Sequence, residues 1–172
     1  MIPQIIDNYL SEERFKELQT NIVWNTDFPW YLNNNVVSGK VEDPESSYYA
    51  THIVYYNCKP LSNIYEKFIP LINSLPNFRS LLRVKVNFYP RTSELYEHDK
   101  HVDYDFEHKG AILSLNTCDG FTRLEDGTIV DSVANRLLLF DSSKPHNSST
   151  TTDPKCRFNI NINSPYMLMV AE

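Results

Sequence analysis

The stretch "CRFNININ", residues 156–163, decides the fold. The apolar residues Phe158, Ile160 and Ile162 alternate with polar residues, which is the period-two pattern of a β-strand with one face in a hydrophobic core. The other face begins with Arg157 and continues with two asparagines. A polar face on a central strand is typical of a sandwich or barrel whose interior contains a polar cavity. This stretch therefore predicts a β architecture with a polar site inside it.

Further short strands are predicted before this stretch. "LLRVKVNFYP" (81–90) alternates in the same way and carries Lys85, Asn87 and Tyr89 on its polar face. Other segments of strand character are 111–116, 121–125 and 136–141. "EDGT" at 125–128 predicts a hairpin, because Asp-Gly favours the tight type I′ turn. Strands of this kind, preceded by helices, predict a β-sandwich or barrel backed by helices.

Two helical patterns occupy the first part of the chain. The first is expected at about 12–22, where Ser11 is a good N-cap and two glutamates follow it. The second covers 61–75, and Pro70 should kink or split it. The sequence therefore predicts helices packed against the sheet.

The composition limits the classes of protein to consider. A chain of 172 residues suits one domain, which we divide into a helical N-terminal part (about 1–80) and a β core (about 81–165). The net charge of −6, with scattered Lys and Arg, disfavours nucleic acid as a partner. No apolar run approaches the ~20 residues that span a membrane, and the start of the chain lacks the features of a signal peptide. Three widely spaced cysteines favour a reducing compartment, so we expect a cytoplasmic protein.

The segment "HVDYD" (101–105) places a histidine two residues before an aspartate. Residues i and i+2 of an extended strand point to the same side, so His101 and Asp103 can reach one metal ion. His146 follows the apolar strand at 136–141 and supplies a third ligand from another strand. Two imidazoles and one carboxylate make the facial triad of non-haem Fe(II) enzymes, which leaves coordination positions open. We call these three residues the His-Asp-His triad.

Arg157 is the first polar-face residue of the last strand, eleven residues after His146. A co-substrate that chelates iron through a 2-oxo acid group directs its distal carboxylate into the barrel. A guanidinium can hold such a carboxylate through two parallel, charge-assisted hydrogen bonds. We therefore expect Arg157 to bind that carboxylate, from a strand that adjoins the strand of His146.

The ordered set of strand, His-x-Asp, Asp-Gly hairpin, apolar strand, histidine and arginine resembles the Fe(II)- and 2-oxoglutarate-dependent oxygenases. Within them it is most similar to the compact prolyl-4-hydroxylase-like group often encoded by bacteriophages. The resemblance is carried by "VNFYPRTSELYEHDKHVDYD" (86–105), "GFTRLEDGTIVDSVANRLLLFDSSKPHNSS" (120–149) and "CRFNININ" (156–163). It implies a double-stranded β-helix, a cupin-like jelly roll, with helices packed on its larger sheet.

The resemblance also implies roles for residues. The His-Asp-His triad would bind Fe(II), Arg157 would bind the C5 carboxylate of 2-oxoglutarate, and Tyr89 and Asn87 are further candidates for contact with this co-substrate. Dioxygen would be the other co-substrate, and ascorbate can serve as a reductant. The expected reaction decarboxylates 2-oxoglutarate to succinate and CO2 and hydroxylates a substrate. Because Asp103 is present, halogenation is disfavoured, since related halogenases lack this carboxylate.

The sequence leaves the substrate open among peptidyl proline, a small molecule and a nucleobase, and we favour a peptide or protein. Many prolyl hydroxylases have lysine where this chain has Arg157. This difference weakens the expectation of a prolyl substrate but not that of the 2-oxoglutarate co-substrate. A second class is a non-catalytic jelly-roll module that binds a metal or another ligand. A third is a metal-free structural β protein.

Several other residues near these motifs are expected to be structural. His52 and His108 should be structural histidines, and His98 should lie in a loop, at the surface or beside the metal ligands. Asp105 is expected to be solvent-exposed or to lie beside the metal ligands. Tyr104 is expected to pack outward, and Arg136 to form a structural ion pair. The polar segments 33–50 and 90–100 are candidates for a lid over the site.

Overall fold

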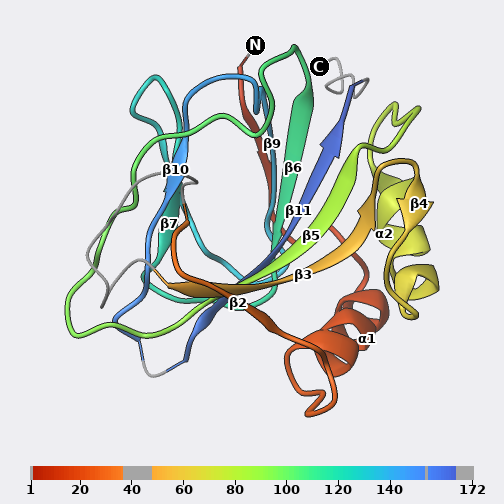
Figure 1. Cartoon of the computed structure of the whole chain (residues 1–172), viewed down its shortest axis with the longest axis horizontal. Helices are drawn as coiled ribbons and strands as arrows, with labels where there is room; N and C mark the ends of the chain where they lie inside the picture. The colour runs from red at the N-terminus through yellow and green to blue at the C-terminus, as the bar shows by residue number, and fades with distance from the viewer. Residues whose placement is uncertain (1, 37–47, 154, 166–172) are drawn as a thin grey trace.

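The computed structural model describes residues 2–36, 48–153 and 155–165. In this part of the chain, the strands form two antiparallel sheets (Figure 1). The large sheet has the order β1-β9-β6-β11-β5-β3-β2, with β4 beside β3, and the small sheet has the order β10-β7-β8. The strands of the large sheet are β1 (Gln4–Ile6), β2 (Tyr31–Asn33), β3 (Tyr49–Tyr56), β4 (Lys59–Pro60), β5 (Arg83–Tyr89), β6 (Lys109–Ser114), β9 (Leu137–Phe140) and β11 (Arg157–Ser164). Those of the small sheet are β7 (Phe121–Arg123), β8 (Ile129–Asp131) and β10 (Asn147–Ser148).

The large sheet lies between two different layers. Figure 1 shows α1 (Glu12–Ile22) and α2 (Ile69–Ser74) on one side of this sheet, and β7 and β10 of the small sheet on the other side. Two facing antiparallel sheets with helices behind the larger one form a helix-backed jelly roll. The predicted fold class is confirmed.

The first helix follows the sequence prediction. It covers Glu12–Ile22, and the hydroxyl oxygen of Ser11 accepts a hydrogen bond from the backbone N–H of Arg14 at 3.4 Å. Phe15 and Leu18 are buried on the face that meets the sheet. No helix in the described part of the chain is long and apolar enough to span a membrane.

The second helical region is shorter than predicted. A 3₁₀ turn at Tyr65–Phe68 leads into α2, and Pro70 lies in the first turn of α2. Proline is tolerated there because the first N–H groups of a helix have no intrahelical partner. Pro70 therefore splits the predicted 61–75 helix.

The sequence analysis described residues 1–80 as a helical part, but this region also contains strands. β3 pairs with β5 along Ala50–Tyr56, and β1 pairs with β9. Most residues of β3 are buried on both faces, so its sequence lacks the alternation that marks a half-exposed strand. The N-terminal part therefore contributes strands to the same large sheet as the predicted β core.

The β7–β8 hairpin forms as predicted, but with a different turn. A type I′ turn needs positive φ at both central residues, whereas here Gly127 alone has positive φ (88°) and Asp126 does not. Gly127 N–H donates to the carbonyl of Leu124 at 3.0 Å, and Leu124 N–H donates to the carbonyl of Thr128 at 2.9 Å. This is a type I turn followed by a left-handed glycine, the usual three-residue hairpin loop.

The two sides of the large sheet have separate cores. On the helix side, Val84, Val86, Ile160 and Ile162 are fully buried and pack in one cluster with residues of both helices. Between the two sheets a smaller cluster fills only part of the space, and its members are Ile112, Leu124, Val130, Leu138 and Phe140. The rest of the space between the sheets is lined by polar residues, and the candidate site lies there.

Candidate metal and co-substrate site

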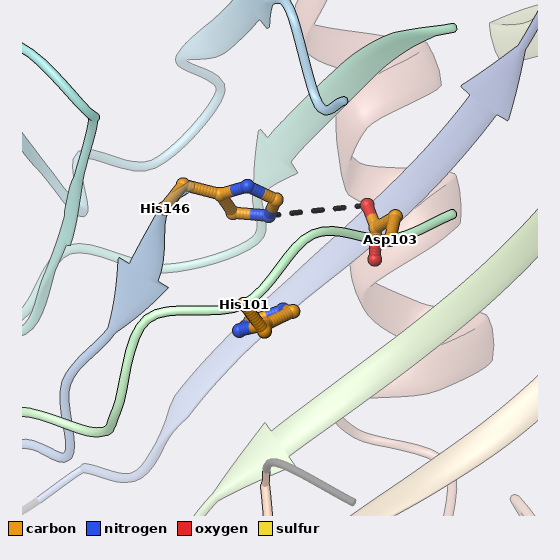
Figure 2. Close-up of side chains that lie close together, drawn as sticks. All are labelled: His101, Asp103 and His146. Carbon is orange, nitrogen blue, oxygen red and sulfur yellow. Dashed lines mark ion pairs between the residues drawn. The ribbon is translucent and has the colours of Figure 1, made fainter. Parts of the chain in front are cut away.

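The three residues of the triad lie together. His101 and His146 form an antiparallel bridge in which each backbone N–H donates to the other residue's carbonyl, at 2.9 and 3.0 Å. Asp103 lies two residues further along, and its N–H donates to the carbonyl of Ser142 at 3.3 Å. One possible ligand atom from each triad residue lies within 4.8 Å of the others, and Figure 2 shows the side chains around a common space. This spacing allows all three to bind one ion.

The sequence argument assumed that His101 and Asp103 lie on a regular strand, but the structure places them in a segment without a regular strand. The segment between β5 and β6 pairs with residues 146–151 only through isolated bridges, such as Glu97 with Ser149. The same-side placement of His101 and Asp103 therefore comes from an extended loop held by these bridges.

Asp103 is held as an ionised carboxylate. Its side chain is 3% exposed, its Oδ1 accepts a hydrogen bond from Arg83 Nη2 at 2.6 Å, and its Oδ2 accepts one from Asn163 Nδ2 at 2.8 Å. Oδ2 also lies 3.9 Å from Nε2 of His146 (Figure 2). Burial alone would raise the pKa of Asp103, but Arg83, the adjacent imidazole of His146 and Lys85 outweigh it and hold this pKa well below its usual range.

The two histidines are held neutral. Burial, followed by the proximity of His146, lowers the pKa of His101 to about 4, and burial also lowers the pKa of His146. The carbonyl of Lys144 lies 2.9 Å from Nδ1 of His146 and accepts a hydrogen bond from Nδ1–H, so Nε2 presents a lone pair toward Asp103. Neutral imidazoles and an ionised carboxylate are the forms that bind a divalent metal, and this donor set fits Fe(II).

Arg157 is a buried cation, only 1% exposed. Its guanidinium donates to Ser132 Oγ at 2.7 Å, to the carbonyl of Ser149 at 3.0 Å and to Thr122 Oγ1 at 3.0 Å. No carboxylate within the described ranges forms an ion pair with it or shifts its pKa. A guanidinium has five N–H donors, so donors and an uncompensated charge remain. Because a buried charge is costly unless it is paired, this position suits the carboxylate of a ligand.

The strand of Arg157 does not adjoin that of His146, which corrects the sequence expectation. β11 lies in the large sheet between β6 and β5, whereas β10, directly after His146, belongs to the small sheet. The long Arg157 side chain instead crosses the space between the sheets and reaches Thr122 on β7. Two facing sheets bring together residues that need not be on neighbouring strands.

The predicted polar faces line one cavity with the triad histidines. Lys85, Asn87 and Tyr89 lie on its wall together with His101 and His146. The amide of Asn87 donates to Asn159 Oδ1 at 2.8 Å. Tyr89 is paired in register with Arg157, whose guanidinium carbon lies 5.1 Å from the tyrosine ring centre. The structure thus brings all six predicted site residues into one region, with the triad near one end and Arg157 at the other.

The other histidines lie outside the triad. His52 is a structural core histidine, as expected, since its ring nitrogens contact the carbonyl of Pro29 and the hydroxyl of Ser62 at 2.9 and 2.8 Å. His108 is fully buried, in keeping with the structural role expected of it. His98 is also buried, 2% exposed, so a surface position is wrong; its ring lies 5.6 Å from that of Tyr89.

The remaining expectations have mixed outcomes. Arg136 forms the expected ion pair, with two hydrogen bonds to Asp7 at 2.6 and 3.0 Å. Asp105 is exposed, and Tyr104 packs against the ring of His108 rather than on the triad. Most of the proposed 33–50 lid lies outside the described residues.

Arg83 and Asn163 are site residues that the sequence reasoning missed. Both belong to the polar faces already recognised, because Arg83 stands two positions before Lys85 and Asn163 two positions after Asn161. Extending the period-two pattern to the strand ends could have found them. Tyr49 also lines the cavity, but it lies on β3, which the sequence did not predict.

No protein-family model and no curated protein matches the chain. Solved structures of similar fold include a prolyl hydroxylase from Trichoplax adhaerens in complex with a hypoxia inducible factor peptide fragment (TM-score 0.63, 15% identity, covering 95% of this chain and 83% of that one). A second is a prolyl-4-hydroxylase from Pseudomonas putida (TM-score 0.60, 14% identity, covering 95% of this chain and 92% of that one). A third is a 2OG-Fe(II) oxygenase family protein from Burkholderia pseudomallei (TM-score 0.65, 8% identity, covering 96% of this chain and 86% of that one). This chain has the fold of the 2OG-Fe(II) oxygenases, with prolyl hydroxylases among the proteins that share it.

Proposed function

We propose that this protein is an Fe(II)- and 2-oxoglutarate-dependent dioxygenase that hydroxylates its substrate. The observation that carries the proposal is the combination of the His-Asp-His triad with the uncompensated, buried Arg157 across the same inter-sheet space. A metal site alone would fit many proteins. A metal site facing a buried cation fits a co-substrate that chelates metal at one end and carries a carboxylate at the other.

Each residue has a role in this proposal. The triad holds Fe(II), and Asp103 offers Oδ2, because this oxygen faces Nε2 of His146 at 3.9 Å and keeps a lone pair beyond its hydrogen bond to Asn163. Arg157 binds the C5 carboxylate of 2-oxoglutarate, beside Tyr89. Asn87, held by Asn159, orients the co-substrate from the cavity wall.

When bound, Fe(II) with 2-oxoglutarate and dioxygen supplies the oxidation, in which the co-substrate is decarboxylated to succinate and CO2. The protein contributes charge and exclusion of water. The neutral state of His101 and the ionised state of Asp103 leave the triad ready for a dication without release of protons. Because Asp103 occupies a ligand position, hydroxylation is favoured over halogenation.

A peptide or protein is the substrate class we propose. It is supported by the shared fold with a prolyl hydroxylase whose structure contains a bound peptide. Nucleic acid is disfavoured by the net charge of −6. We further propose that residues 1–172 form a single oxygenase domain, supported by the pairing of β1 with β9. A cytoplasmic location is supported by three free cysteines.

The first test is spectroscopic. Anaerobic protein is mixed with Fe(II) and 2-oxoglutarate, and the weak visible charge-transfer band of the chelated co-substrate is recorded. Wild type is compared with His146→Ala and Arg157→Ala. We expect a band in wild type, no band without His146, and a need for much more 2-oxoglutarate without Arg157.

Turnover separates an enzyme from a binding module. With oxygen and ascorbate present, a dioxygenase forms succinate from 2-oxoglutarate, slowly even without its substrate. A band without succinate, across candidate peptides, would favour the non-catalytic jelly-roll module. No band at saturating iron and co-substrate would contradict the proposed function.

A further inference from the structure

Lys85 is a second cation in the inter-sheet cavity with no partner assigned to it. It lies on β5 and lines the cavity together with His101 and His146. Within the described ranges its ammonium makes no ion pair or hydrogen bond, and its nearest aromatic contact is the ring of Tyr49, with the ammonium nitrogen 5.8 Å from the ring centre. A lysine this poorly compensated inside a protein is costly, so its presence calls for an anion.

The triad carboxylate does not provide that anion. Asp103 is already paired with Arg83 at 2.6 Å, and Lys85 lies outside ion-pair distance of it. Arg83 and Lys85 therefore place two positive charges beside one carboxylate, before any metal adds more. A negatively charged ligand group next to the metal position would correct this imbalance.

The positions of Lys85 and Arg157 match the two ends of one ligand. In the β5–β11 register, Lys85 is opposite Asn161, and Tyr89 is opposite Arg157. The two levels are four positions apart along β5, which corresponds to about 13 Å at a strand rise of ~3.3 Å per residue. A five-carbon dicarboxylate with one cation beyond each end spans a distance of this order. Lys85 is on the triad side of this span, because its charge acts on all three triad residues.

We propose that Lys85 binds the carboxylate at the metal end of the 2-oxo acid, so that Lys85 and Arg157 hold the two ends of 2-oxoglutarate. This inference rests on the proposed function and adds a positioning residue to it. Lys85 donates N–H hydrogen bonds to the carboxylate that also approaches the metal, while Arg157 holds the distal carboxylate. Part of the co-substrate affinity would then be independent of the metal.

The test uses two ligands that differ only at the distal end. 2-Oxoglutarate carries both carboxylates, whereas 2-oxopentanoate lacks the distal one. Dissociation constants are measured by calorimetry for the metal-free and Mn(II)-loaded full chain. The variants are Lys85→Met, Lys85→Arg and Arg157→Met, and Lys67→Met removes one exposed positive charge as the matched control.

Lys85→Met should weaken both ligands by the same factor, on the order of 10–100-fold, which is the loss of a hydrogen bond to a charged group. Lys85→Arg should restore part of this affinity. Arg157→Met should weaken 2-oxoglutarate and leave 2-oxopentanoate nearly unchanged. Lys67→Met should alter neither.

Two results would overturn the inference while leaving the proposed function intact. One is wild-type affinity of a folded Lys85→Met variant for both ligands. The other is a loss for 2-oxoglutarate alone, which would place Lys85 at the distal end. If wild type binds no 2-oxoglutarate with or without Mn(II), the proposed function fails, and this inference fails with it. The melting temperature of each metal-free variant verifies that it is folded.

Discussion

The two faces of the β5–β11 strand pair differ in kind. The helix-facing side consists of Val84, Val86, Ile160 and Ile162, all fully buried and apolar. The side that faces the small sheet carries Lys85, Asn87, Asn159 and Asn161. The residues of the two faces alternate along the same two strands. A comparison of the two faces therefore separates the residues that stabilise the fold from those that form the site.

The helix-facing side contributes stability, whereas the site side reduces it. Burial of apolar side chains is favourable at roughly 25 cal/mol per Å². The buried Arg157 and the partly buried Lys85, without carboxylate partners among the described residues, have the opposite effect in the ligand-free protein. Such a destabilising arrangement is typical of a preformed ligand site.

The largest effect is expected from His146→Ala. Removal of one of three metal ligands should lower Fe(II) affinity on the order of 100-fold or more, since even the loss of a residue that only supports a ligand lowers metal affinity by ~10–100-fold. Succinate formation should fall to background. The measurement is the rise in melting temperature on adding Mn(II), compared with His52→Gln, which changes a buried histidine outside the triad. If Mn(II) raised the melting temperature of both variants equally, His146 would not be a metal ligand, and the polar side of the sheet would not be the metal-binding side.

Ile160→Ala should cause the next largest effect, on the other face of the same strand. Ile160 is fully buried in the helix-side core, so its truncation to alanine should lower the free energy of unfolding by ~3 kcal/mol. Urea denaturation of the metal-free protein measures this loss. The Mn(II)-induced stabilisation should stay as in wild type, and its disappearance would mean that the two faces are not energetically separate.

Lys85→Met should raise the stability of the metal-free protein, by ~2 kcal/mol at pH 7, because it removes a partly buried, poorly compensated charge. Burial, followed by the charge of Arg83, lowers the pKa of Lys85 to about 8, although Asp103 opposes this. Between this value and the unfolded pKa of ~10.4, the unfolded chain binds more protons than the folded one. The free energy of unfolding of wild type should therefore rise with pH over this window.

The control for this prediction is the difference in the free energy of unfolding between wild type and Lys85→Met. Other groups titrate in the same range, so urea denaturation of wild type and Lys85→Met is compared at pH 7, 8, 9 and 10. The gap between them should narrow as the pH rises. A constant gap, or a less stable variant at pH 7, would contradict the view that Lys85 destabilises the ligand-free site.

The smallest effect is expected from Ser11→Ala, at the N-terminus of α1. Its capping hydrogen bond to Arg14 is long, at 3.4 Å, so the loss should be about 0.5–1 kcal/mol, at the lower end for an N-cap. Thermal denaturation measures it, and co-substrate affinity should not change. A change in affinity would indicate that the helix layer influences the site through the sheet.

Much of the site could be predicted because its signals are local. The alternation in 156–163 and 81–90 identifies which side chains share a face, whatever the strands pair with. Residue type and order single out His101, Asp103 and His146, and the fold brings one ligand atom of each within 4.8 Å of the others. Arg83 and Asn163 carried the same local signal and were missed only because the pattern was not extended to the strand ends.

The elements that escaped prediction depend on distant partners. β3 becomes part of the large sheet by pairing with β5, and its residues alone show no polar face. β1 is three residues long and is stabilised by pairing with β9, more than 130 residues away. The turn at Gly127 was assigned from a dipeptide preference, whereas the flanking strands selected a type I turn with a left-handed glycine.

By itself, the sequence determined the identity of the donors and the polarity of each strand face, since period and residue type are properties of neighbouring residues. Only the tertiary structure decided that Arg157 reaches across to the small sheet, that Asp103 is paired with Arg83, and that Lys85 is left without a described partner. The first two contacts join residues that are 35 and 20 positions apart in the sequence, and they depend on how the chain folds around the space between the sheets. Charge compensation is settled by distances in space, and no local pattern encodes those distances.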